Sequence, residues 1–135
     1  MDRLFLDACV LFSAGYSPKS PLRCLWELKD VVLLSSAYVI AEAERNLSRL
    51  RLEQMDDLKR LEEQLTLVKD SPTTAMEEAI NLPEKDLPVL MAAVKAKATH
   101  LLTVDKKHFG PFYEQKLGGA LVLTPGEYLR RIRIR

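Results

Sequence analysis

Short apolar runs alternate along the chain with longer stretches in which apolar residues recur at helical spacing. The apolar runs predict strands at Arg3–Leu6, Val31–Leu34, His100–Val104 and Ala120–Leu123, each suited to burial on both faces of a sheet. Strands that alternate with helices are typical of a parallel sheet covered by helices on both sides. We therefore predict an α/β fold, a three-layer α/β/α sandwich with a central, mostly parallel sheet of 4-5 strands.

Two helical segments are expected in the first half of the chain. Serines and prolines at the start of residues 17–28 offer caps and a first-turn proline for a helix over the apolar positions that follow. Ser35 or Ser36 then caps a second helix. Its apolar positions begin at Val39 and continue, after a break, to Leu65, which predicts a long helical hairpin.

Two more helices are expected in the second half. Asp86 opens a helix from about Leu87 to Ala98, because Asp is a preferred capping residue. Thr124 begins the last helix, and Glu127, three residues later, completes the pattern of a capping box.

The segment between the hairpin and the helix at Leu87 is ambiguous. Leu67–Val68 fits a short strand and Thr74–Ile80 a short helix, and neither pattern is strong. Neither a linker composition nor an internal repeat divides the chain. We therefore expect a single domain over residues 1–135.

The composition is that of a soluble globular protein, with 47% hydrophobic and 29% charged residues. Cys9 and Cys24 are too few for a disulfide framework and indicate reduced thiols. The opening apolar run Leu4–Leu6 is too short for a signal peptide, and no stretch approaches the roughly 20 apolar residues of a membrane span. We expect a cytoplasmic protein without a membrane partner.

Acidic residues follow the predicted strands. Asp7 and Asp105 come directly after apolar runs, and in open parallel sheets ligands bind beyond the carboxyl ends of the strands. Asp86 begins the helix that leads to the strand before Asp105, and Glu42 lies about two turns into the helix after the second strand. The four carboxylates are therefore expected to converge on one small volume.

Each of these acids also has a purely structural interpretation. Asp86 and Asp105 could simply cap the helical turns that follow them. Glu42 could be a solvated helix residue paired with Arg45 or Asn46. Asp7 is the hardest to explain in this way, because a carboxylate at the end of a buried strand is costly to desolvate without a partner.

Several stretches together resemble the PIN-domain family. They are Asp7 after the first strand, Ser36 followed six residues later by Glu42, Asp86–Val94, and Leu101–Phe109. The ending Leu123–Leu129 resembles that of a bacterial and archaeal branch described as toxins of toxin–antitoxin pairs. Each motif alone is weak, but four acids in the right order and elements, over nearly the whole chain, are fairly specific.

The resemblance implies a metal-dependent endoribonuclease that hydrolyses RNA phosphodiester bonds with metal-activated water. The family's catalytic and metal-binding acids correspond to Asp7, Glu42, Asp86 and Asp105, and its supporting hydroxyl to Thr103. Cys9 is a departure, because the family commonly has Asn or Ser there. A thiol is a poorer hydrogen-bond partner, so the exchange could weaken the orientation of a metal ligand, unless Cys9 is merely a small buried residue.

Carboxylate oxygens without a convergent set of His or Cys favour Mg²⁺ or Mn²⁺. Asp7, Asp86 and Asp105 are our first choices for direct ligands, with Glu42 acting through water. Crowding of these acids should also raise the pKa of at least one of them. His108 is expected to face solvent beside the site, too far along the chain from His100 to form a zinc motif with it.

The overall net charge of +1 gives little long-range attraction to polyanions, so local basic residues matter more. Arg45, Lys106 and Lys107 are candidates to position an RNA backbone, although surface Lys and Arg often only keep a helix solvated. An antitoxin protein is the second expected partner. We also expect a homodimer, because the hairpin has more apolar positions than one side of a small sheet covers: Leu47, Leu50, Leu58, Leu61 and Leu65.

Two other functions remain open from the sequence. A binding module with the same fold that cleaves poorly is one, and Cys9 favours it weakly. The other is a phosphorylated receiver-like domain, which needs an acidic pair near its start. Asp2 lies too far before Asp7 to provide that pair.

Overall fold

A computed structural model describes residues 1–70 and 86–134. It has a six-stranded sheet in the order β3-β2-β1-β4-β6-β5, in which only the β5–β6 pair is antiparallel. The strands are β1 Asp2–Leu6, β2 Val31–Ser36, β3 Thr66–Val68, β4 His100–Leu102, β5 Lys116–Leu117 and β6 Ala120–Leu123. The predicted fold class is confirmed, with six strands instead of four to five because short edge strands extend both sides.

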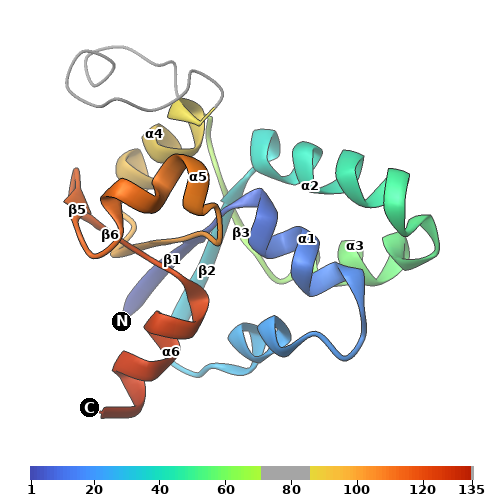
Figure 1. The fold of residues 1–135 in the computed structure, drawn as a ribbon, viewed down its shortest axis with the longest axis horizontal. Helices are drawn as coiled ribbons and strands as arrows, with labels where there is room; N and C mark the ends of the chain where they lie inside the picture. The colour runs from blue at the N-terminus through green and yellow to red at the C-terminus, as the bar shows by residue number, and fades with distance from the viewer. Residues whose placement is uncertain (71–85, 135) are drawn as a thin grey trace.

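Helices cover both sides of the sheet. In Figure 1, α1, α2 and α3 lie together to the right of the strands, with α4 and α5 to the left. The α-helices are α1 Ala8–Tyr16, α2 Ala37–Leu50, α3 Met55–Glu63, α4 Leu87–Lys95, α5 Lys106–Phe109 and α6 Pro125–Ile134. The 3₁₀ helices are η1 Pro21–Glu27, η2 Leu52–Gln54 and η3 Gly110–Phe112.

Helix α1 was not predicted. The apolar run that forms β1 continues past Asp7 into Ala8–Leu11, so the hydrophobic pattern has no visible change of period. Asp7 marks the change of structure, because its side chain accepts a hydrogen bond from the Ala8 backbone and caps the helix. The helix is apolar on most sides because it packs against both α2 and α3.

The other helices depart from the predictions mainly at their ends. The segment predicted as a helix over residues 17–28 is the 3₁₀ helix η1, capped by Ser20. Helix α4 stops at Lys95, three residues before the predicted end at Ala98, and Lys97 has a positive φ of 58°. The predicted short helix at Thr74–Ile80 lies outside the described residues.

Two predicted caps are present. The Ser36 side chain accepts a hydrogen bond from the Val39 backbone at the start of α2. At the start of α6, the Glu127 backbone donates to the Thr124 hydroxyl, but the Glu127 carboxylate pairs with Arg130 and does not complete a capping box.

The core lies around the central strands, where Leu4, Phe5 and Leu6 of β1 are fully buried. Leu47, Leu58, Leu61 and Leu65 of the hairpin are buried within the chain as well, whereas Leu50 and Leu52, at 65% and 64% exposure, project into solvent. Most of the apolar positions that suggested a homodimer are thus covered within the chain, and the homodimer stays a prediction. In the described part of the chain, no helix has the length and apolar character needed to cross a membrane.

Gly118 is required at the β5–β6 turn. Its φ is +59°, and a Cβ built there would lie 2.7 Å from a Val94 methyl group on α4. We expect Gly118→Ala to destabilise the protein by about 2 kcal/mol or more, from backbone strain together with overpacking. Urea unfolding measures the loss.

Gly126→Ala is the matched control. Gly126 lies in the first turn of α6 with no atom within 4 Å of a built Cβ, and alanine is the better helix former. Equal losses for the two variants would contradict the assigned role of Gly118.

Candidate functional site

Asp7 lies where β1 ends and α1 begins. The Ala8 backbone donates to its Oδ1 at 2.8 Å, and the Thr103 hydroxyl donates to its Oδ2 at 2.8 Å. The Asp7 backbone N–H itself donates to the Leu102 carbonyl, which extends the pairing of β1 with β4. With only 5% of the residue exposed, the carboxylate is held in one orientation at the carboxyl edge of the sheet.

Thr103 and Cys9 support this carboxylate. The fully buried Thr103 hydroxyl also accepts a hydrogen bond from the Asp105 backbone, at 3.1 Å. The Cys9 thiol lies 3.6 Å from Asp7 Oδ2 and accepts from the Val104 backbone at 3.3 Å. Cys9 therefore contacts both strand ends, and burial, followed by the charge of Asp7, raises the pKa of its thiol to about 12.

Asp105 caps the short helix α5. Its Oδ1 accepts a hydrogen bond from the His108 backbone at 3.1 Å, so the interpretation of this acid as a helix cap is correct for that oxygen. Its Oδ2 lies 2.9 Å from His108 Nδ1. The expectation that His108 faces solvent is wrong, because only 17% of its side chain is exposed.

Asp86 lies at the start of α4 without capping it, since its side chain makes no capping hydrogen bond. Its Oδ2 lies 2.9 Å from the same His108 Nδ1. The capping interpretation of Asp86 is therefore wrong for the side chain, which is turned toward α5.

Glu42, half-buried on α2, completes the group. All four predicted acids line a single cavity of about 540 Å³, and no ion pair joins Glu42 to Arg45 among the described residues. The other residues that line the cavity are Ala8, Cys9, Phe12, Asn46, Arg49, Leu50 and Val104.

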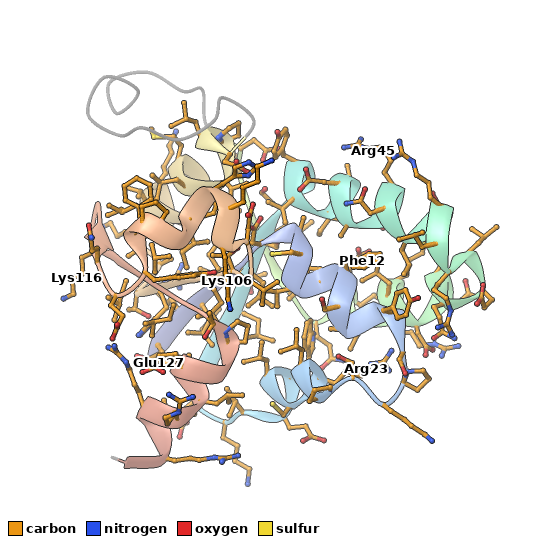
Figure 2. The ribbon with its side chains drawn as sticks, viewed as in Figure 1. Phe12, Arg23, Arg45, Lys106, Lys116 and Glu127 are labelled. Atoms are coloured by element: carbon orange, nitrogen blue, oxygen red, sulfur yellow. The ribbon has the colours of Figure 1, made fainter. Side chains whose placement is uncertain are left out.

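The candidate RNA-positioning residues lie outside this cavity. Arg45, Lys106 and Lys107 are exposed and are not among its lining residues. In Figure 2, the labelled Arg45 on α2 and Lys106 at the start of α5 lie well apart. Sequence reasoning missed Asn46 and Arg49, although they follow Glu42 by four and seven positions and so share its helix face.

The donor set fits a hard divalent cation. Carboxylate oxygens are the ligands that Mg²⁺ and Mn²⁺ prefer, and four carboxylates line this cavity. At one side, single ligand atoms of Asp86, Asp105 and His108 lie within 4.8 Å of one another.

The expected rise of a carboxyl pKa is found at Asp7, whose pKa is raised to about 6. Burial is the largest cause, and the charges of Glu42 and Asp86 add smaller effects. Hydrogen bonds from Thr103 and Ala8 act in the opposite direction. Crowding of acids is thus not the main reason, because removal from water disfavours the Asp7 anion more than its neighbours do.

This buried carboxyl predicts how stability depends on pH. A carboxyl whose pKa rises on folding stabilises the fold fully below the unfolded value of 3.8, and this contribution is lost as the pH rises through about 6. In EDTA, the free energy of unfolding should therefore increase as the pH falls from 7.5 to 5. The shift from 3.8 to about 6 is worth about 3 kcal/mol in all, of which about 1.4 kcal/mol appears between pH 7.5 and 5.

Asp7→Asn tests the assignment. The amide keeps the shape and removes the buried charge, so the variant should melt higher than wild type in EDTA at pH 7.5 and lose this pH dependence. It should also lose most of the stabilisation by Mn²⁺, which amounts to about 2.7 kcal/mol when free ion is a hundredfold above its dissociation constant. A variant that melts lower in EDTA and still responds fully to Mn²⁺ would show that Asp7 is purely structural.

Comparison with solved structures supports the fold. A chain of VapBC2 from Rickettsia felis, bound to a promoter DNA fragment, aligns with a TM-score of 0.67 and 17% identity over 90% of this chain and 98% of that one. VapC20 from Mycobacterium tuberculosis, a toxin that cleaves the sarcin-ricin loop, aligns with a TM-score of 0.56 and 15% identity over 77% and 91%. A protein from Pyrobaculum aerophilum aligns with a TM-score of 0.64 and 18% identity over 99% and 91%.

The family follows from the sequence match. No curated protein matches the chain. A family model described as PIN domain matches residues 3–107, which is well over half of the chain and includes all four acids of the cavity. The chain therefore belongs to the PIN-domain family, as its motifs led us to expect.

Proposed function

We propose that this protein is a metal-dependent endoribonuclease that hydrolyses RNA phosphodiester bonds. The observation that supports this most strongly is the lining of one cavity by Asp7, Glu42, Asp86 and Asp105. Asp7, Asp86 and Asp105 lie at the starts of α1, α4 and α5, and Glu42 lies within α2, so their meeting depends on the whole fold. The described lining contains no histidine and no serine, so a hydroxyl nucleophile with an adjacent base is not assembled there.

Asp7, Asp86 and Asp105 are the proposed direct ligands of Mg²⁺ or Mn²⁺, with Glu42 acting through water. Such an ion would supply activation of water and stabilisation of charge on the phosphoryl oxygens. The protein's part is to hold the carboxylates. Thr103 and the Ala8 amide fix Asp7, and the helix cap fixes Asp105.

A phosphate backbone would need cations near this acidic cavity. Among the basic residues near the cavity, Arg49 is the best placed, because it lines the cavity itself. Arg45, Lys106 and Lys107 stand farther out and would contact flanking phosphates, which orient a strand without reading its sequence.

We further propose that the protein is the toxin of a toxin–antitoxin pair. This rests on the toxin-like ending at Leu123–Leu129 and on the fold shared with VapBC2 and VapC20. Its proposed partners are RNA, an antitoxin protein and a second copy of itself, and its proposed location is the cytoplasm. Residues 1–135 are proposed to form one domain.

The second candidate is a PIN-fold module that binds RNA or protein but cleaves weakly. The thiol of Cys9 was the reason to consider it. Its contacts with Asp7 and Val104 weaken that reason, because the thiol occupies a supporting position with both a donor and an acceptor role. Membership of the PIN family replaces the receiver-like alternative.

Cleavage of single-stranded RNA should require Mn²⁺ or Mg²⁺ and stop in EDTA. Asp7→Asn and Asp105→Asn should each lower the rate by about 100-fold or more, because each removes a proposed ligand. The measurement is single-turnover cleavage of a labelled RNA. Cleavage by both variants at the wild-type rate would identify a contaminating nuclease and contradict the proposal.

Cys9→Asn should leave the cleavage rate unchanged or raise it. An amide can donate to Asp7 Oδ2 and accept from the Val104 backbone, and so replaces these two of the thiol's contacts, the third being with the Thr103 hydroxyl. Cys9→Ala removes both and should lower the rate roughly tenfold. Cys24→Ala, in η1 away from the cavity, is the matched control. A large loss in Cys9→Asn, with the melting temperature maintained, would mean that the thiol itself is needed.

A further inference from the structure

One ring nitrogen joins two of the cavity's acids. His108 Nδ1 lies 2.9 Å from Asp86 Oδ2 and 2.9 Å from Asp105 Oδ2. Asp86 belongs to the start of α4, whereas Asp105 and His108 belong to α5. The imidazole therefore links carboxylates from two different elements.

The backbone fixes the place of this ring. The His108 N–H donates to Asp105 Oδ1 while the ring contacts Oδ2, so one residue holds both oxygens of that carboxylate. The Asp86 side chain does not cap α4. Its contact with His108 spans the gap between α4 and α5.

His108 contacts two acids of the cavity without itself lining it. Asp86 and Asp105 are among the residues that line it, and His108 is not. An imidazole in this place can orient carboxylates toward an ion within the cavity without contacting RNA. Partners behind metal ligands commonly act in this way.

We propose that His108 is a positioning residue that holds the Asp86 and Asp105 carboxylates together, so that a divalent cation meets a preformed site. Two carboxylates repel each other, and a ring N–H that is hydrogen-bonded to Asp105 Oδ2 and lies 2.9 Å from Asp86 Oδ2 opposes that repulsion. The inference rests on the proposed function, because it assumes that the ion binds at these acids.

Mn²⁺ binding measured by isothermal titration calorimetry tests the proposal without any RNA. His108→Ala removes the donor and should weaken binding 10- to 100-fold, the usual effect of losing a partner behind a ligand. His108→Asn carries an amide N–H near the position of Nδ1 and should bind within a few-fold of wild type. His108→Gln extends the amide by one methylene and should resemble His108→Ala.

Two controls accompany these variants. Gln115→Ala changes an exposed side chain beyond α5 and should bind Mn²⁺ as wild type does. Thermal melts in EDTA identify any variant that fails to fold. If His108→Ala fails to fold, the comparison of His108→Asn with His108→Gln still decides, because only the former places an amide near Nδ1.

The outcomes separate this inference from the proposed function. If the wild type binds no Mn²⁺ or Mg²⁺, the proposed function fails. If it binds and His108→Ala binds equally well, only the positioning role is overturned. If His108→Asn is as weak as His108→Ala, and both lose preference for Mn²⁺ over Mg²⁺, the ring nitrogen is a direct ligand and positioning is again overturned.

Discussion

The site depends first on the burial of one carboxylate at the junction of β1 and α1. Asp7 follows a strand whose last three residues are fully buried and begins a helix, and its two oxygens are held by the Ala8 amide and the Thr103 hydroxyl. Because Thr103 follows β4, this contact also brings the turn before Asp105 to the same edge of the sheet. Asp7 thus extends the pairing of β1 with β4 through its backbone, and its side chain both caps α1 and forms part of the proposed metal site.

The alternation of apolar runs and helical spacing was enough to predict the parallel sheet and its two covering layers. Helix α1 escaped prediction because it is buried against α2 and α3, so its residues show no polar face that would reveal the helical period. The edge strand β5, only two residues long, carries too few residues for any pattern. Secondary structure could therefore be predicted for helices with one solvent-exposed face and for strands that are apolar along their whole length.

The acids of the cavity were identified by their places after strands and by the resemblance to PIN domains, and all four line it. His108 was misplaced, because its contact with Asp86 spans 22 positions and no local spacing signals it. The spacing of three residues between Asp105 and His108 was a usable signal, since such residues are neighbours on a helix. Arg49 could also have been found, because it shares a helix face with Glu42.

The burial of the Asp7 carboxylate lowers the stability of the fold at neutral pH, and the same negative charge is what the proposed cation binding requires. The raised pKa means that near neutral pH the anion, the form able to bind a cation, is the one that the surrounding protein disfavours. Asn keeps the size of this side chain and can retain both hydrogen-bond partners without the buried charge, so a relative with no need to bind a cation here would gain stability from the exchange. Drift would then erase Asp7 early and leave the core of β1 intact. An acid retained at this position therefore indicates selection for its negative charge, because the packing of the core alone does not require one.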